Sequence, residues 1–224
     1  MDHMKRFAIY YAPREGVFAD AAAAWLGWDL GRRCAVAQPD VPALADLTAD
    51  PRKYGFHGTI KPPFRLAADA TPDDLARAVE ELAQGLSTVE MPGLEMVVLE
   101  GFLAIVPGHD PALSGLAAKV VQSLEGFRAP LTEAEIARRR PDSLTPRQRE
   151  LLAIYGYPYV MEEFQFHLTL SGRLDTARAA DLQKAAQAHF AGLIPQPFRL
   201  EDLCLCGEDA EGRFHLLHRY ALSA

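Results

Sequence analysis

The sequence is short of the features that mark several common classes of protein. It contains only three cysteines, Cys34, Cys204 and Cys206. This odd, low number argues against a disulfide framework and favours free thiols in a reducing compartment. No apolar run approaches the roughly 18 residues of a membrane span, and residues 1–7 lack the apolar stretch of a signal peptide. We therefore expect a cytoplasmic protein that does not span a membrane.

Basic charge is also scarce. The chain has 23 Lys and Arg against 30 Asp and Glu, a net charge of −7, and its pI is near 5.5. Broad, non-specific binding to nucleic acid needs a basic surface, so long nucleic acid is disfavoured as a partner. A small, locally basic pocket stays compatible with this balance. No glycine-rich phosphate loop follows an expected strand, which disfavours P-loop and dinucleotide-binding folds.

Apolar residues, in contrast, are plentiful. They make up 49% of the 224 residues, enough to build a full core. Periodicity and turn residues predict a regular series of elements. We expect strands at 7–11, at 96–106 with a break near Gly101, at 198–206 and at 213–221, and helices at 18–30, 71–85, 111–125 and 175–191. This order predicts an α+β fold with weak internal duplication.

Residues 130–160 differ from the rest of the chain. Two stretches, beginning at Thr132 and Thr145, fit a capping box, a hydroxyl residue followed three positions later by Glu or Gln. Five arginines gather here in an otherwise acidic protein, and the stretch closes on Tyr155-Gly-Tyr-Pro-Tyr159. We interpret it as an Arg-rich helical insertion between the two halves of a single domain that spans residues 1–224.

Two short segments of the sequence are nearly alike. They are Tyr54-Gly-Phe-His57-Gly-Thr59-Ile-Lys61 and Phe164-Gln-Phe-His167-Leu-Thr169-Leu-Ser171. Each has a His and a Thr two positions apart in an apolar, strand-like run. Alternate residues of a strand point to the same face, so each His should share a face with its Thr. The first stretch, stopped by Pro62-Pro63, would place Lys61 on that face as well.

Two imidazoles that face each other across a cleft suit acid–base chemistry on a phosphodiester. Histidine has an ordinary pKa of about 6.5, so near neutral pH one ring can accept a proton while the other donates one. Each transfer typically contributes about 10²–10⁴-fold in rate. The threonine hydroxyls can donate hydrogen bonds to the non-bridging phosphate oxygens, and no metal or other cofactor is required.

Either segment alone is more simply explained as an ordinary strand with a solvated or core-satisfied His and Thr. The two together favour function, because the same alternation recurs in matching contexts. The pattern also resembles the two-histidine (2H) phosphoesterase superfamily, which is defined by two His-x-Ser/Thr motifs on strands. The flanking Pro-Pro-Phe64 and Tyr155-Gly-Tyr-Pro-Tyr159 are similar to a bacterial branch whose members carry names from phosphonate metabolism.

The resemblance implies a fold of two pseudo-symmetric lobes, each an antiparallel sheet flanked by helices, with a central cleft. It implies His57 and His167 as the acid–base pair and Thr59 and Thr169 as phosphate-binding hydroxyls. It does not fix which histidine is the base. The function implied is a hydrolase, a metal-independent phosphodiesterase that acts on a small cyclic or linear phosphodiester, with no obligate protein partner evident.

Further substrate-binding candidates rest on face, charge and position alone. They are Lys61, Arg139, Tyr157 and Tyr159. A solvated helix face would explain the arginine equally well, and packing of the insertion would explain the tyrosines. Two other functions stay open. One is a non-catalytic module that binds a phosphorylated metabolite. The other is an RNA end-processing or ligase-like enzyme, which only the Arg-rich insertion supports.

Overall fold

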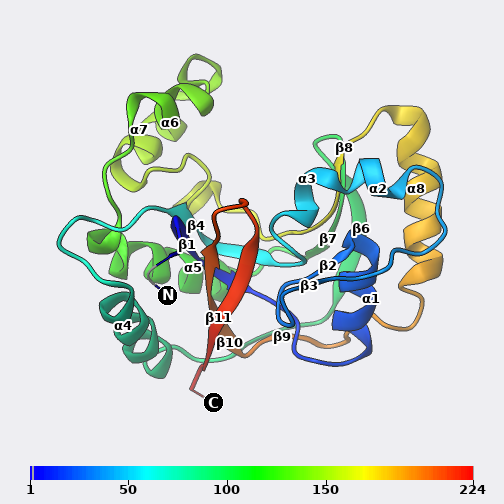
Figure 1. The fold of residues 1–224 in the computed structure, drawn as a ribbon, viewed down its shortest axis with the longest axis horizontal. Helices are drawn as coiled ribbons and strands as arrows, with labels where there is room; N and C mark the ends of the chain where they lie inside the picture. Colours follow the sequence, from blue (N-terminus) through cyan, green and yellow to red (C-terminus); the bar gives the residue numbers. More distant parts are fainter. Residues whose placement is uncertain (2, 224) are drawn as a thin grey trace.

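A seven-stranded antiparallel sheet forms the centre of the computed structural model, which describes residues 1 and 3–223 (Figure 1). Its strands follow the order β11-β10-β1-β4-β8-β7-β6. Their bounds are β1 Arg6–Tyr11, β4 Gly58–Phe64, β6 Leu94–Leu99, β7 Phe102–Pro107, β8 Leu168–Arg173, β10 Asp202–Glu208 and β11 Phe214–Ala221. The predicted α+β fold, an antiparallel sheet flanked by helices, is confirmed.

The sheet consists of two groups of strands that meet at one point. The first group is β11, β10, β1 and β4, and the second is β8, β7 and β6. The junction between β4 and β8 is a single residue pair, Gly58 opposite Leu168. Because pairing between β4 and β8 stops after this pair, the strands of each group bond mainly to one another, and the two groups meet only here. A pseudo-symmetric relation between the halves stays a prediction.

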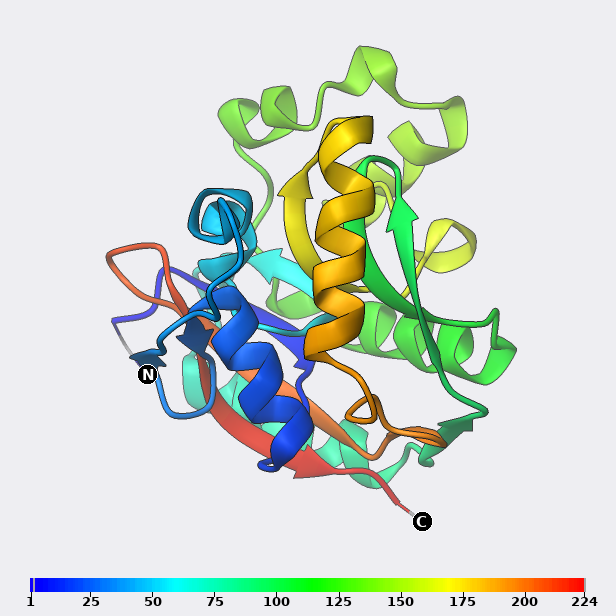
Figure 2. The ribbon, with the colours of Figure 1, turned by 90° about the vertical axis from the view of Figure 1, so that its right-hand side faces the viewer.

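Long helices cover the core face of both groups. Helices α4 (Pro72–Gln84) and α5 (Pro111–Ser123) contact the first group, and α1 (Val17–Leu26) and α8 (Thr176–His189) contact the second. Figure 2 shows α1 and α8 side by side, and the Nε2 atom of His189 lies 2.9 Å from the carbonyl of Ala21. Apolar residues from all four helices and both groups of strands form one buried cluster. The core therefore holds the two halves as one body.

Short elements complete the chain. They are β2 Trp28–Asp29, β3 Cys34–Ala35, α2 Leu44–Leu47, α3 Ala49–Arg52, β5 Val89–Met91, α6 Glu133–Arg138, α7 Pro146–Tyr155, β9 Phe198–Leu200, and 3₁₀ turns at Glu125–Phe127, Pro141–Ser143 and Met161–Glu163. In Figure 1, α6 and α7 rise on one side of the molecule and α2 and α3 on the other. No helix among the described residues is long and apolar enough to cross a bilayer.

Helix starts follow the local sequence closely. The hydroxyls of Thr132 and Thr145 accept hydrogen bonds from the N–H groups three residues on, and the side chains of Glu135 and Gln148 return the bond. Both predicted capping boxes are therefore present. The Arg65 guanidinium pairs with Glu135 at 3.0 Å and fixes the start of α6 to the chain that follows β4. That residues 130–160 are an insertion stays a prediction.

Several boundaries differ from the sequence-based expectation. The strand expected at 198–206 is two strands, β9 and β10, which belong to different sheets. The helix expected at 18–30 ends at Leu26, because Gly27 adopts φ +81° and its N–H bonds the carbonyl of Ala23. The expected stop at Pro62-Pro63 is wrong, since β4 continues to Phe64, which pairs with Phe7. Register shifts on this strand leave the prolines where no ladder hydrogen bond is needed.

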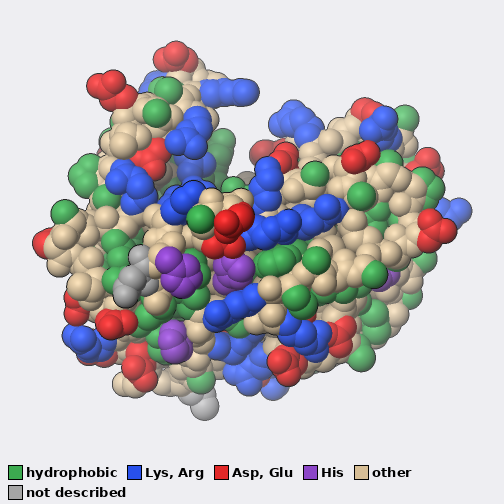
Figure 3. All heavy atoms as spheres, in the orientation of Figure 1, with side chains coloured by type: hydrophobic (Ala, Val, Ile, Leu, Met, Phe, Trp, Pro, Cys, Tyr) green, Lys and Arg blue, Asp and Glu red, His purple; other side chains and the backbone are tan. Residues whose placement is uncertain are grey.

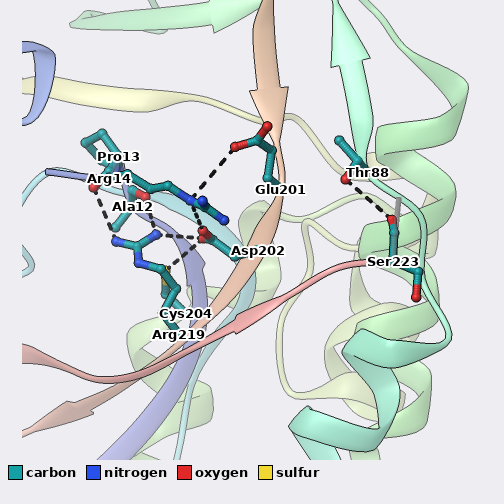
Figure 4. Close-up of polar contacts among 9 residues, drawn as sticks. All are labelled: Ala12, Pro13, Arg14, Thr88, Glu201, Asp202, Cys204, Arg219 and Ser223. Atoms are coloured by element: carbon teal, nitrogen blue, oxygen red, sulfur yellow. Dashed lines mark hydrogen bonds and ion pairs between the residues drawn. The ribbon is translucent and has the colours of Figure 1, made fainter. Parts of the chain in front are cut away.

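A buried carboxylate fixes the chain where it leaves β1 (Figure 4). Asp202 accepts from Arg14 Nε at 2.8 Å and from Arg219 Nη1 at 2.6 Å. Arg219 also donates to the carbonyl of Ala12 at 2.8 Å. Pairing with two guanidinium groups compensates the desolvation of this carboxylate. These contacts join β1, β10 and β11. They hold β1 in place beside β4, the strand that carries Thr59.

Candidate functional site

His57 immediately precedes β4 and is held by contacts on three sides. Its Nδ1–H donates to the carbonyl of Gly55 at 2.9 Å, and its Nε2 lies 3.2 Å from the hydroxyl of Thr59. The ring stacks on buried Tyr10, with centroids 3.9 Å apart and planes 28° from parallel. Because Nδ1 holds its proton on a carbonyl, the neutral ring presents the Nε2 lone pair to Thr59 and to the cavity.

His167 repeats this arrangement immediately before β8. Its Nδ1–H donates to the carbonyl of Gln165 at 2.8 Å, again two residues earlier in the chain. Its ring meets the edge of Phe102 at a centroid distance of 5.5 Å. Both histidines are thus held in the same tautomer by their own backbone, and both direct Nε2 away from it.

The single pair that joins the two halves of the sheet also brings the two motifs together. Gly58 lies opposite Leu168 in antiparallel register. If that register is continued by one position on each side, His57 is opposite Thr169 and Thr59 is opposite His167. A side chain at Gly58 has no room: a Cβ there would lie 2.3 Å and 2.4 Å from ring atoms of Phe166. Close approach of the two strands therefore depends on a glycine between His57 and Thr59.

The surroundings of His57 keep its ring neutral. Burial lowers the pKa of His57 to about 4, the Gly55 hydrogen bond opposes that shift, and the charge of His167 adds to the lowering. Ionised forms are disfavoured out of water, and like charges repel. His57 is therefore a proton acceptor at neutral pH, in electrostatic contact with the second imidazole.

Two adjoining cavities open over these residues. The larger, of about 370 Å³, is bordered by His57, Thr59 and Thr169. The other, of about 300 Å³, is bordered by His167 and Thr59. They have a common wall made of Thr59, Pro62, Phe102 and Tyr157. Cavities of this size suit a small molecule, and together the two are bordered by all four residues of the two motifs.

The prediction that Lys61 lies on the face of His57 and Thr59 is wrong. Thr59 pairs with Tyr10 but Lys61 pairs with Ile9, so Ile60 is an extra residue in a β-bulge. The bulge reverses the alternation and turns Lys61 to the helix-covered face. Its buried ammonium donates to Glu125 at 2.9 Å and to the carbonyl of Val121 at 3.2 Å, and burial lowers its pKa.

The candidates from the 130–160 stretch lie at the cavities. The Arg139 guanidinium lies 4.7 Å from the centroid of the Tyr157 ring, and both residues border the larger cavity. Burial raises the pKa of Tyr157. Tyr159 borders the adjoining cavity, with its ring 5.7 Å from that of Tyr157 and 47% of the residue exposed. Whether these three contact a substrate stays a prediction.

Sequence reasoning missed several residues of the site. Tyr10 is invisible in a plain strand of apolar residues, because only pairing with β4 puts it beneath His57. Arg6 and Arg173 border the larger cavity from the ends of β1 and β8. Gly58 carried the one available signal: a glycine inside a strand pattern marks a close approach of another chain segment.

The two cysteines near the C-terminus do not form a metal site with neighbouring histidines in the described part of the chain. Cys204 and Cys206 are fully buried in β10, and burial raises the pKa of both thiols. Among the described residues, no group of three or more His, Cys, Asp or Glu is placed to hold a metal ion. The cavities are bordered by imidazole, hydroxyl, guanidinium and carboxylate groups.

Fold and site together define a protein with two His-x-Thr motifs at two adjoining cavities beside an antiparallel sheet. The chain matches, over residues 59–215, the family model described as "Protein of unknown function (DUF1045)". More than half of the sequence lies in that match, so the chain belongs to this family. The matched range includes the second motif and begins at Thr59 of the first.

Curated relatives carry the name of a kinase. The chain is 35% identical over 222 residues to a "Ribose 1,5-bisphosphate phosphokinase PhnN" of Janthinobacterium sp. (strain Marseille), an alignment over 94% of this chain and 49% of that protein. It is 33% identical to a protein of the same name from Laribacter hongkongensis (strain HLHK9), over 92% and 49%. The chain thus spans about half the length of the curated relatives it matches.

Among solved structures, similarity extends over the whole chain but is distant. E. coli LigT complexed with NADP+ aligns over 99% of both chains, with 14% identity and a TM-score of 0.44. E. coli LigT complexed with 3'-AMP gives 15% identity and 0.43, and a protein described as a phosphoesterase gives 14% and 0.41.

Proposed function

We propose that the chain is a phosphodiesterase in which His57 and His167 transfer protons and Thr59 and Thr169 bind the phosphate. The observation that supports this proposal is the pairing of Gly58 with Leu168, because each of these residues directly follows the histidine and directly precedes the threonine of its motif. One phosphate between the two motifs would meet two imidazole Nε2 atoms and two hydroxyls. That set supplies a base, an acid and two oxyanion donors.

The lowered pKa of His57 supports a division of labour. Neutral His57 takes the proton from a water molecule as its oxygen attacks phosphorus. The bond from phosphorus to the leaving oxygen breaks, and that oxygen takes a proton from the imidazolium of His167. A second proton exchange with solvent restores both rings, so that diester and water give a phosphomonoester and an alcohol.

The threonines stabilise the charge that builds on the non-bridging oxygens. In the structure, the Thr59 hydroxyl lies against Nε2 of His57, from which rotation about χ1 redirects it to a phosphate oxygen. Loss of one such donor typically costs about 10²–10³-fold in kcat.

The names of the longer relatives suggest the class of substrate. Those proteins are named for a kinase of ribose 1,5-bisphosphate, and a phosphodiesterase in the same chain would most directly release a ribose phosphate for it. We therefore propose a small sugar phosphodiester, cyclic or linear, as the substrate, and a role in phosphonate metabolism.

The test is a screen of the purified chain against cyclic phosphates, including cyclic ribose phosphates and 2′,3′-cyclic nucleotides. We expect His57→Ala and His167→Ala each to lower kcat/KM by about 10³-fold or more with an unchanged thermal midpoint. Activity should persist in EDTA. Full activity in either variant contradicts the acid–base roles, and tight binding without product would indicate a binding module instead.

A further inference from the structure

The larger cavity carries more positive charge than one phosphate at the His-x-Thr motifs requires. Three arginines border it, Arg6, Arg139 and Arg173, against one carboxylate, Asp50. Asp50 is itself paired with Lys53 at 2.9 Å. In a chain of net charge −7, such a concentration of guanidinium groups at one cavity calls for a chemical reason.

The three arginines are not equivalent. Arg6 is occupied, because Nη2 donates to Glu208 at 2.7 Å and Nε bonds the second oxygen of the same carboxylate. Arg139 and Arg173 have no carboxylate partner in the described part of the chain. The guanidinium of Arg139 lies over the ring of Tyr157, a contact that positions it without neutralising its charge.

These two arginines come from opposite sides of the cavity. Arg139 is the C-cap residue directly after α6, and Arg173 ends β8, which contacts α3. Figure 3 shows Lys and Arg side chains along the hollow between the part that carries α6 and α7 and the part that carries α2 and α3. A group bound between them would lie beside His57, Thr59 and Thr169, which border the same cavity.

The charge pattern also differs between the two cavities. The one that His167 borders contains the carboxylates Glu100 and Glu163 and no arginine or lysine. A second anionic group is therefore favoured on the His57 side. A tetrahedral phosphate can accept hydrogen bonds from guanidinium groups on two walls at once, and planar guanidinium donors match its oxygens in pairs.

We propose that Arg139 and Arg173 form a subsite for a second phosphate, so that the substrate is a sugar phosphodiester that also carries a phosphomonoester. The inference rests on the proposed phosphodiesterase function for the identity of the first phosphate. The subsite gives the Arg-rich stretch a role in selecting the substrate, separate from the acid–base chemistry.

The experiment is calorimetry with two phosphomonoesters, ribose 1-phosphate and ribose 1,5-bisphosphate. Since neither is a phosphodiester, binding is measured whether or not the chain hydrolyses anything. We expect the wild-type chain to bind the bisphosphate at least about tenfold more tightly, the usual contribution of charge-assisted hydrogen bonds. Arg139→Gln and Arg173→Gln should each remove most of that preference and leave the affinity for ribose 1-phosphate within about twofold.

Arg138→Gln is the matched control, because Arg138 precedes Arg139 in α6, is exposed and does not border the cavity. It should keep the wild-type preference. Equal affinity for the two ligands in the wild-type chain, binding of neither, or equal losses for both ligands in Arg139→Gln would overturn the subsite. Hydrolysis of a cyclic phosphate without a preference for the bisphosphate would remove the subsite alone. A preference without hydrolysis would leave the subsite and remove the phosphodiesterase.

Discussion

The two His-x-Thr segments are nearly the same in sequence and in backbone setting, yet their surroundings differ. Each histidine directly precedes a strand and donates from Nδ1 to the carbonyl two residues earlier. His57, however, stacks on fully buried Tyr10 and adjoins the arginine-lined cavity. His167 meets the edge of Phe102 beside Glu100 and Glu163.

The difference teaches that a repeated motif fixes the kind of group presented but not its chemical state. The backbone carbonyl sets the tautomer in both motifs, a local effect. Neighbours from distant strands decide how far each ring is removed from water and which charges it meets. In the proposed reaction this asymmetry makes His57 the general base, and His167 has the role of proton donor.

Outside the four His and Thr residues, the largest effect is expected from adding a side chain at Gly58, where the two motifs meet. Gly58→Ala would force its Cβ into the Phe166 ring, so the two strands must separate or the ring must move. We expect a loss of about 2–3 kcal/mol in the free energy of unfolding and a fall in kcat/KM of about 10²-fold, because misplacement by about 1 Å is costly. Chemical denaturation and steady-state kinetics measure the two effects.

Gly108→Ala is the control for that substitution, because nothing lies within 4 Å of a Cβ at Gly108. It should change stability by less than about 0.5 kcal/mol. The pair Gly58→Ala with Phe166→Leu should recover part of the loss, since the smaller side chain yields space. A Gly58→Ala protein as stable and active as the wild type would contradict the close approach of β4 and β8.

A pH-dependent effect of intermediate size is expected at His57. The folded pKa of His57 is about 4, below the value near 6.5 of an unfolded chain. Between about pH 6.5 and 4 the unfolded state therefore binds a proton that the folded state does not. Stability from this group is complete above about pH 6.5 and is lost as the pH falls towards 4, by roughly 1–3 kcal/mol.

Chemical denaturation of wild type and His57→Gln at pH 7.5 and pH 4.5 measures this contribution. The variant should lose less stability on acidification than the wild type does. An identical loss in both proteins would show that another group carries the dependence.

The smallest effect is expected at Tyr10, which sets the environment of His57 alone. Its hydroxyl is buried and has no hydrogen-bond partner in the described part of the chain. Tyr10→Phe keeps the stacked ring and removes that unpaired group, so we expect stability to stay equal or rise by up to about 1 kcal/mol. Catalysis should change by less than about threefold, because the stacking on His57 is retained.

Tyr10→Leu, the matched comparison, removes the stacked ring. It should lower kcat by about tenfold or more with little change in KM, because the base loses its orientation. Thermal unfolding and steady-state kinetics of the two variants measure the difference. Equal kinetics in Tyr10→Phe and Tyr10→Leu would argue against a role for the stacked ring.

Much of the local structure could be predicted from the sequence. The caps at Thr132 and Thr145 form as expected, because a side chain that bonds an N–H three residues away acts within one turn. The break near Gly101 is a turn between β6 and β7, with Glu100 and Gly101 at positive φ. Signals of this kind depend on neighbours in sequence alone.

Features that depend on a neighbouring strand were predicted wrongly or missed. Strict alternation put Lys61 beside His57, and the bulge at Ile60 reversed it. A bulge depends on which strand lies alongside and on how the two twist together, so one strand's own residues do not reveal it. Tyr10 was missed for the same reason, since its role comes from pairing with Thr59.

The sequence by itself determined the elements, the tautomer-fixing carbonyls and the presence of two His-x-Thr motifs, because each depends on residues a few positions apart. Only the tertiary structure decided that Gly58 faces Leu168, that Lys61 turns into the core and that Arg139 meets the cavity from a distant helix. Those contacts join residues far apart in the chain, and burial and strand pairing select them together when the whole core forms.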